Sequence, residues 1–117
     1  MSTVTYFPAE ISGTLAMPPS KSAAHRAILC AALAKGVSTL FPIDSSQDMF
    51  ATMEAVQAMG AVVSYNKESR ILTVDGSRTG TIPAGEIHCR ESGSTLRFFI
   101  PLFSLCDQTV RFIGKGR

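Results

Sequence analysis

The sequence predicts a mixed α/β domain, and three observations lead to this class. Residues 21–34 and 47–59 have the composition and the hydrophobic spacing of helices. Residues 61–65 and 70–74 flank the polar turn 66–69, which is typical of a β-hairpin. Residues 87–105 pass from a short strand through a glycine-containing loop into an apolar helix. At 117 residues the chain can bury one modest core.

The composition excludes several classes of protein. Hydrophobic residues make up 45% of the chain and charged residues 17%, which indicates a folded domain and not a disordered one. The net charge of +2, without a Lys/Arg-rich block, argues against a nucleic-acid partner. No apolar run approaches the ~20 residues that cross a membrane. The first residues lack the basic and apolar regions of a signal peptide, so we expect a cytoplasmic protein without membrane association.

The cysteines and histidines do not indicate a metal site. Cys30, Cys89 and Cys106 are odd in number, far apart and without Cys-x-x-Cys spacing. They are expected to be reduced, buried thiols and not metal ligands or disulfide partners. His25 and His88 stand in no metal-ligand or catalytic-triad pattern, so both are interpreted as structural or surface residues.

The N-terminal half of the chain gives clear element boundaries. Residues 3–7 and 10–16 are predicted strands, and the two prolines that follow place a helix start at or just after Ser20. That helix is expected over 21–34, with Gly36 at its C-terminal stop. Residues 37–41 then form a short strand.

A second helix is predicted over residues 47–59. Ser45 and Asp48 stand in a relation like that of a capping box, which favours a start at this point. Apolar side chains recur at helical spacing along it, and we expect them to lie in the core: Met49, Phe50, Met53, Val56 and Met59.

The C-terminal half contains shorter elements. Residues 76–85 are turn-rich and expected to be exposed. Pro101 is expected to shift or kink a helix that runs through Leu105. In order, the predicted segments are the hairpin 61–74, the turn-rich stretch 76–85, a strand at 87–90, the loop 91–95, the helix and a last strand at 109–113.

The most informative segment for function is residues 18–26, Pro-Pro-Ser-Lys-Ser-Ala-Ala-His-Arg. The N-terminus of a helix has free backbone N–H groups and a positive dipole end. Lys21 adds a point charge, Ser22 a hydroxyl and Arg26, one turn later, a planar set of donors. Together they predict a site for a small phosphorylated or carboxylated anion. A plain capped surface helix remains the alternative for this segment.

Two known anion or nucleophile motifs do not fit residues 18–26. A Walker A loop needs glycine where this chain has Leu15 and Ser20. The Ser-x-x-Lys motif of penicillin-binding enzymes needs serine where this chain has Pro18.

A second loop, residues 91–95 (Glu-Ser-Gly-Ser-Thr), also joins a strand to a helix N-terminus. Gly93 permits close backbone approach by a ligand, and the free N–H groups suit an anion. Many such turns carry glycine and serine without any ligand, so this loop supports the site only in combination with the first.

Four blocks carry a resemblance to a known family. They are Pro-Ser-Lys-Ser-x-x-x-Arg at 19–26, Ile-Asp-Ser-Ser-Gln-Asp at 43–48, Glu-Ser-Gly-Ser-Thr-Leu-Arg at 91–97, and Gly-Lys-Gly-Arg at 114–117. In this order they resemble the start of the 5-enolpyruvylshikimate-3-phosphate synthase family. The related UDP-N-acetylglucosamine enolpyruvyl transferases carry a Gly-Ala-Lys-Asn type of element at the first block.

The resemblance implies a fold of βαβαββ units, three in each of two domains, in a considerably longer enzyme. This chain therefore resembles an N-terminal fragment, with residues 18–117 as part of the N-terminal substrate-binding domain. From 20 to 74 the predicted order is αβαββ, most of one unit, and a second unit starts at about 86. Residues 1–17 are expected to belong to strands of the second domain. The family's second arginine for phosphoenolpyruvate would lie beyond Arg117.

The resemblance also implies roles for individual residues. The family transfers the enolpyruvyl group of phosphoenolpyruvate to shikimate 3-phosphate, in the shikimate pathway to aromatic amino acids, and no metal or organic cofactor is expected. Lys21 would contact both anions, and Ser22 and Arg26 would hold shikimate 3-phosphate. Gly93 would line the phosphoenolpyruvate pocket, where glyphosate also binds. Glu91 stands where many members have Asn.

The family's acid/base residues lie mostly outside this chain, so its catalytic residues stay unknown. We expect an isolated chain without turnover, whose partner is the missing C-terminal remainder of the enzyme. Two alternatives stay open. The chain is a non-catalytic anion-binding domain of the same fold, or it binds nothing until the remainder associates with it.

Overall fold

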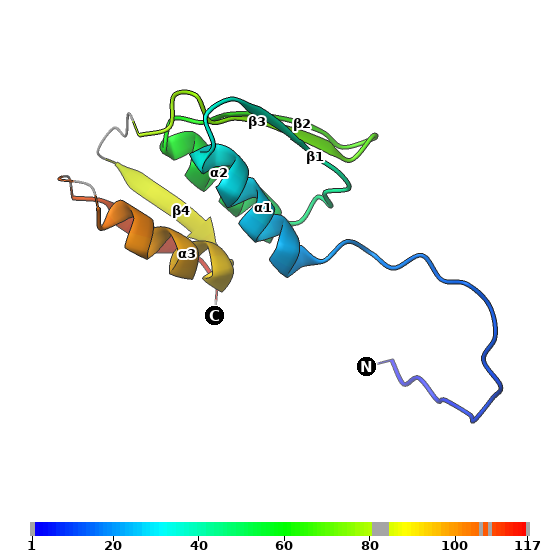
Figure 1. Cartoon of the computed structure of the whole chain (residues 1–117). Coiled ribbons are helices and arrows are strands. Elements are labelled where there is room, and N and C mark those ends of the chain that lie inside the picture. Colours follow the sequence, from blue (N-terminus) through cyan, green and yellow to red (C-terminus); the bar gives the residue numbers. More distant parts are fainter. Residues whose placement is uncertain (1, 81–84, 106, 108, 117) are drawn as a thin grey trace.

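The computed structural model describes residues 2–80, 85–105, 107 and 109–116, and it has the α/β architecture that the sequence predicts (Figure 1). Residues 81–84 of the turn-rich stretch, Cys106 and Arg117 lie outside the described residues. The elements in order are α1 (Lys21–Leu33), β1 (Val37–Leu40), α2 (Gln47–Ala58), β2 (Val62–Asn66), β3 (Ile71–Asp75), β4 (Glu86–Arg90), α3 (Gly93–Phe103) and β5 (Arg111–Gly114).

The first five elements form one layered unit. The strands make an antiparallel sheet in the order β1-β3-β2, in which β2 and β3 are the predicted hairpin. Leu72 and Val74 on the central strand β3 point to one face and are fully buried, because α1 and α2 cover that face (Figure 1). The order αβαββ agrees with the sequence prediction for residues 20–74.

The last three elements begin a second unit. β4 and β5 are parallel neighbours, joined by α3 as the crossover. The pairing starts with Glu86 opposite Arg111 and shifts between His88 and Arg90, where the strand is irregular. α2 packs against this pair as well as against the sheet, so it is the element shared by both units.

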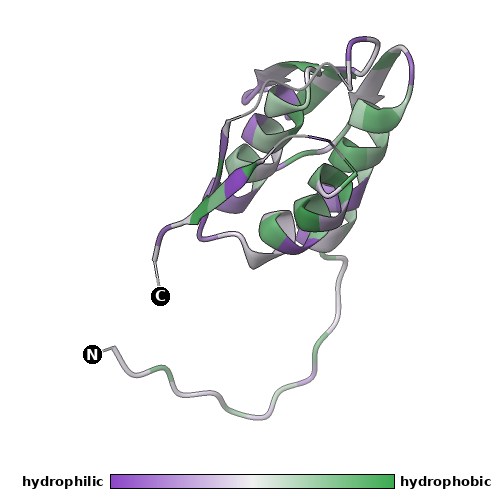
Figure 2. Ribbon diagram, turned by 90° about the vertical axis from the view of Figure 1, so that its left-hand side faces the viewer, coloured by the Kyte–Doolittle hydropathy of each residue, from purple (hydrophilic) through white to green (hydrophobic). Residues whose placement is uncertain are grey.

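The core lies between these layers, and the predicted stripe of α2 is confirmed as part of it. Met49, Met53, Val56 and Met59 are buried, and Phe50 packs half-buried against them. Figure 2 shows hydrophobic residues concentrated on the helices, with scattered ones along the otherwise pale N-terminal segment. Burial of these side chains is the main source of stability for so small a unit.

The predicted strands at 3–7 and 10–16 are absent: residues 2–20 form neither helix nor strand. A strand needs a neighbour for its backbone N–H and C=O groups, and the segment runs away from the other described residues (Figure 1). Its large apolar side chains are exposed as a consequence: Val4, Tyr6, Phe7, Ile11, Leu15 and Met17.

Four smaller expectations are corrected. The cap of α2 is Ser46 and not Ser45, because the helix starts at Gln47 and the Ser46 hydroxyl accepts from the Met49 N–H at 3.3 Å. The last helix ends at Phe103, two residues earlier than expected, and the last strand starts at Arg111. Cys30 is exposed and not buried, because the opposite side of α1 faces the core, whereas Cys89 is buried as expected.

Candidate functional site

The N-terminal end of α1 starts where the prolines place it. Ser20 is the N-cap, and its hydroxyl accepts from the Ala23 N–H at 3.3 Å. Lys21 and Ser22 are therefore in the first turn, and both are exposed. No acidic residue occupies this turn, so the positive end of the helix is not neutralised from within.

Arg26 is held in a defined orientation one turn further along. Its guanidinium donates to the Ser22 hydroxyl at 2.8 Å and more weakly to the Ser22 carbonyl at 3.4 Å. It also lies over the Phe98 ring of α3, with 5.6 Å between its Cζ atom and the ring centroid. A side chain fixed in this way loses less entropy when it binds an anion.

Lys21 faces α2 and not the Ser22–Arg26 pair. Its Nζ atom lies 3.0 Å from a carboxylate oxygen of Asp48, in the first turn of α2. An exposed pair of this kind contributes only about 0–1 kcal/mol to stability. Its effect is positional, because it draws the ammonium group into the space between the two helix N-termini.

That space is a cavity of about 440 Å³. Its lining comes from the N-terminal ends of α1 and α2 and the segments before them: Pro18, Pro19, Lys21, Ala24, Asp44, Ser45, Ser46 and Met49. Its volume is in the range of small-molecule sites. Two helix N-termini and an ammonium group at its edge favour a compact anion, whereas the Asp44 carboxylate in the lining opposes one.

Gly93 lies beside a different cavity. It is the first residue of α3, whose N-cap Ser92 accepts from the Thr95 N–H at 3.1 Å. A side-chain Cβ atom at position 93 would be 3.6 Å from the Arg97 guanidinium, which is ordinary contact. The adjoining cavity of about 200 Å³ is lined by residues 89–93, Leu96 and residues 114–116. Lys21, Ser22 and Arg26 therefore share the N-terminal end of α1, where Lys21 points to Asp48 and Ser22 pairs with Arg26. Gly93 lies beside a separate hollow.

Arg90 is a candidate functional residue that the sequence analysis did not identify. Its φ angle of +51° is rare for a residue with a side chain, and its guanidinium binds Glu54 at 2.6 and 3.1 Å and also contacts Gln47. The hydrogen bond that Arg90 donates to Glu54 raises the pKa of Arg90. No local pattern pairs these residues, because Glu54 is 36 positions away in the chain.

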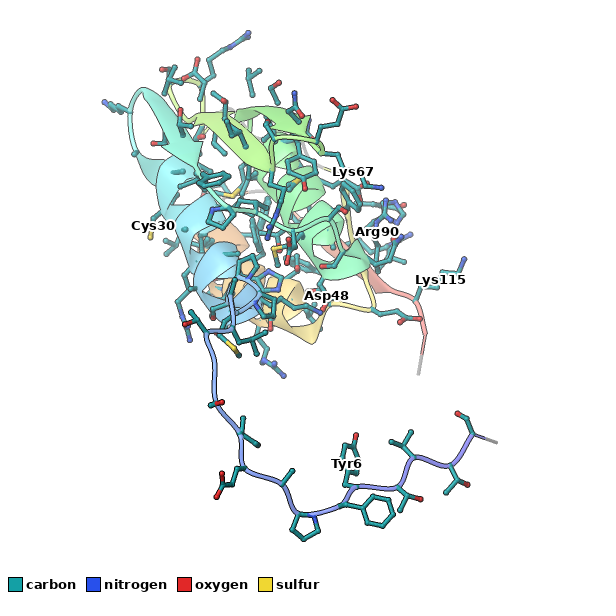
Figure 3. The ribbon with its side chains drawn as sticks, turned by 90° about the vertical axis from the view of Figure 1, so that its right-hand side faces the viewer. Tyr6, Cys30, Asp48, Lys67, Arg90 and Lys115 are labelled. Carbon is teal, nitrogen blue, oxygen red and sulfur yellow. The ribbon has the colours of Figure 1, made fainter. Side chains whose placement is uncertain are left out.

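A third cavity of about 390 Å³ lies beside Arg90. Gln47, Glu91 and Lys115 complete its lining. Figure 3 shows Asp48, Arg90 and Lys115 on one side of the molecule. Glu91 therefore adds a carboxylate to a cavity that two cationic side chains also line.

The histidines agree with the structural interpretation. His25 is buried, and its Nδ1 atom lies 2.6 Å from the Thr52 hydroxyl. Burial lowers the pKa of His25. His88 is exposed on β4, 3.9 Å from Glu86. Within the described residues, no three His, Cys, Asp or Glu side chains gather as a metal site would require. Nor is any helix there long and apolar enough to cross a membrane.

Comparisons with known proteins point to one family. The family model described as EPSP synthase (3-phosphoshikimate 1-carboxyvinyltransferase) matches residues 6–117. A 3-phosphoshikimate 1-carboxyvinyltransferase of Clostridium perfringens (strain ATCC 13124) is 42% identical over 116 residues, which are 99% of this chain and 27% of the relative. The protein of the same name from Clostridium kluyveri is 38% identical over 117 residues, which are 100% of this chain and 27% of the relative.

A solved structure supports the fold. An EPSP synthase from Acinetobacter baumannii has a TM-score of 0.73 and 24% identity, with 89% of this chain and 24% of that chain covered. The chain thus spans about a quarter of the length of the relatives that it matches.

Proposed function

Because this chain belongs to the EPSP synthase (3-phosphoshikimate 1-carboxyvinyltransferase) family, we propose that it supplies part of the substrate-binding domain of an enolpyruvyl transferase. The reaction moves the enolpyruvyl group of phosphoenolpyruvate to the 5-hydroxyl of shikimate 3-phosphate and releases phosphate. Residues 18–117 form part of the N-terminal domain. The 117-residue chain alone has no turnover, and detection of enolpyruvyl transfer by the purified chain would overturn this.

The arrangement of Ser22 and Arg26 is the observation that carries the proposal. The Ser22 hydroxyl and the Arg26 guanidinium are 2.8 Å apart at an exposed helix N-terminus, so one phosphate oxygen can reach both. They hold shikimate 3-phosphate. Lys21, at the edge of the neighbouring cavity, contacts both substrates, and its charge offsets the repulsion between two anions.

Gly93 lines the phosphoenolpyruvate pocket in this proposal, where glyphosate also binds. The support is its position as the first residue of α3, next to a cavity and with only Arg97 near the position of a Cβ atom. The N–H groups of this helix end then face the ligand's phosphate or carboxylate.

Gly93→Ala is expected to separate binding from folding. The free energy of unfolding should change by no more than about 0.5 kcal/mol, because the new methyl group makes only ordinary contact. Amide shifts of Ser94 and Thr95 on addition of phosphoenolpyruvate or glyphosate should weaken, since the methyl group crowds the ligand. Equal responses in the variant and the wild type would contradict this role.

Residues 1–17 pair with strands of the second domain in this proposal. The segment carries six large apolar side chains that are exposed, among them Ile11 at 98%. An apolar segment of this kind is typical of a surface that another unit covers. The relatives are about four times as long as this chain, which leaves room for such a unit.

The proposal is tested by NMR titration of the chain with shikimate 3-phosphate, with inorganic phosphate as the reference ligand. Charge-assisted hydrogen bonds contribute about 1.5–3 kcal/mol each, so we expect a Kd no better than about millimolar. Shifts at Lys21, Ser22 and Arg26 that are stronger for the sugar phosphate would support the proposal. Equal responses to both ligands would favour a generic anion-binding domain.

Arg26→Gln is the matching variant for this titration. It should remove the selective response, because the planar pair of donors is lost. Lys35→Gln removes one positive charge near the other end of α1, where the side chain is exposed, and should leave the response unchanged. If both variants bind equally weakly, net charge and not the site determines binding.

A further inference from the structure

The described residues contain four buried polar side chains, and these form one connected series. His25 Nδ1 lies 2.6 Å from Thr52 Oγ1, and Thr52 Oγ1 lies 2.8 Å from Thr95 Oγ1. Thr95 Oγ1 in turn donates to Ser92 Oγ at 2.7 Å. We call these four residues the buried polar chain. It runs from α1 through α2 to the N-cap of α3.

The protons of this chain can all be directed one way. With a proton on Nδ1, His25 donates to Thr52, and Thr95 donates to Ser92. The single proton of Thr52 then points to Thr95 at 2.8 Å, which is nearer than the competing acceptor, the Asp48 carbonyl oxygen at 3.2 Å. The other ring nitrogen, Nε2, is buried and has no hydrogen-bond partner among the described residues. A charged ring would therefore bury an unpaired N–H group at that atom, so the geometry favours the neutral ring.

Two members of the chain are next to a residue of the proposed site, and a third lies near the partner of Lys21. His25 precedes Arg26, and Ser92 precedes Gly93. Thr52 lies one turn after Asp48, the partner of Lys21, and its hydroxyl is 3.2 Å from the Asp48 carbonyl oxygen. The other buried contacts of α1 come from Ala24, Ile28, Ala31 and Ala32, which pack without directional preference. Hydrogen bonds add the direction that apolar packing lacks.

We propose that His25 is a positioning residue whose neutral ring, acting through Thr52 and Thr95, fixes the N-terminal turn of α1 relative to that of α3. The group Lys21–Ser22–Arg26 is thereby held at a set separation from Gly93, on the other cavity. The inference rests on the proposed function only in its second test, which uses shikimate 3-phosphate as the ligand.

The first test needs no ligand. Long-range ¹H–¹⁵N spectra of the histidine rings should show His25 neutral with its proton on Nδ1. Thr95→Val removes a hydroxyl two links away while it keeps the side-chain shape, and it should shift the His25 Nδ1 signal. His88, exposed on β4, supplies the reference signal in the same spectrum. A charged ring, a proton on Nε2 or an unchanged His25 signal in Thr95→Val would overturn the proposal.

The second test separates positioning from stability. Thr52→Val should weaken shikimate 3-phosphate binding by about tenfold, the upper range for one lost hydrogen bond. Thr52→Ser keeps the hydroxyl and should restore binding, although it removes a buried methyl group. If the wild type binds and Thr52→Val binds equally well, the proposal fails. If the wild type does not bind, the site needs the missing remainder of the enzyme, and the ring spectra still decide the inference. Should Thr52→Val not fold, Thr95→Val takes its place.

The pH dependence of stability follows from the same burial. Burial lowers the pKa of His25 from its ordinary value of 6.5. The charge of Asp48 on α2 raises this pKa, and the charge of Lys21 on α1 lowers it. From α3, the group that faces the buried polar chain is the hydroxyl of Thr95. The unfolded state then binds more protons below 6.5 than the folded state does. The contribution of the neutral His25 ring to the free energy of unfolding is therefore complete above pH 6.5, and it is lost as the pH falls through the folded-state pKa.

Urea denaturation at a series of pH values measures this dependence. His25→Asn should remove the part of the slope that lies just below pH 6.5, because Asn does not titrate. The exposed His88→Asn is the matched control and should keep that slope. The same slope in the wild type and in His25→Asn would show that His25 is not the group responsible.

Discussion

Gly76→Ala is expected to destabilise the chain by about 3 kcal/mol or more, the upper range for overpacking in a rigid surrounding. Gly76 follows β3 directly, and its N–H donates to the Gly36 carbonyl at 3.0 Å. A Cβ atom there would overlap the Ala34 carbonyl oxygen and would lie 2.5 Å from that of Ala32. The three nearest atoms are backbone carbonyl oxygens at the end of α1, so no side-chain movement relieves these contacts.

The measurement is the free energy of unfolding in urea, with Gly93→Ala as the matched control. Both variants add one methyl group, but the methyl at position 93 meets only a flexible guanidinium at 3.6 Å. A domain with a total stability of about 5–15 kcal/mol loses a large share of it in the first variant and almost none in the second. A Gly76→Ala variant as stable as the wild type would mean that β3 and α1 do not meet as described.

The close approach of Gly76 to the end of α1 is a contact that the sequence does not predict. The sequence indicated a turn that begins at residue 76, which is correct. It contained no sign that this glycine lies against the end of α1, some forty residues earlier in the chain. Local signals such as turn residues predict local conformation, and the packing partner is decided by the tertiary arrangement.

The helices and strands also divide into those set by local signals and those that depend on tertiary contacts. Ser20 and the two prolines predicted the start of α1 correctly, because capping and proline geometry act within a few residues. The strands predicted at 3–7 and 10–16 were wrong for the described chain, because a strand exists only with a neighbour. Ser45 was preferred to Ser46 because adjacent serines give the same capping signal.

The candidate site was predictable in part. Lys21, Ser22 and Arg26 lie on one helix, and the pairing of Ser22 with Arg26 follows from helical spacing. The ion pair of Lys21 with Asp48 and the cation–π contact of Arg26 with Phe98 join residues far apart in the chain. The buried polar chain likewise joins three helices, and threonine at a helix interior carries no signal of such a partner. These contacts needed the structure.

Phe99→Ala is expected to cost about 3–5 kcal/mol, the usual range for truncation of a buried aromatic side chain. Phe99 is fully buried, and its ring centroid lies 6.2 Å from that of Phe103, which in turn meets Phe112 of β5. The ring therefore anchors α3 against the rest of the core. Because Gly93 and Ser92 stand at the start of this helix, a cavity at position 99 loosens the proposed phosphoenolpyruvate pocket as well.

Phe98→Ala is the contrasting variant, because the next residue along the helix points elsewhere. The Phe98 ring is half-buried and lies under the Arg26 guanidinium. Its removal should cost far less stability than that of Phe99, but it releases Arg26 from a contact of about 0.5–1 kcal/mol and so weakens shikimate 3-phosphate binding by about twofold to fivefold. Urea denaturation and the NMR titration measure the two effects separately. Equal loss of stability in both variants would mean that α3 is rotated from the described position, and then the Arg26–Phe98 contact would not orient the proposed phosphate site.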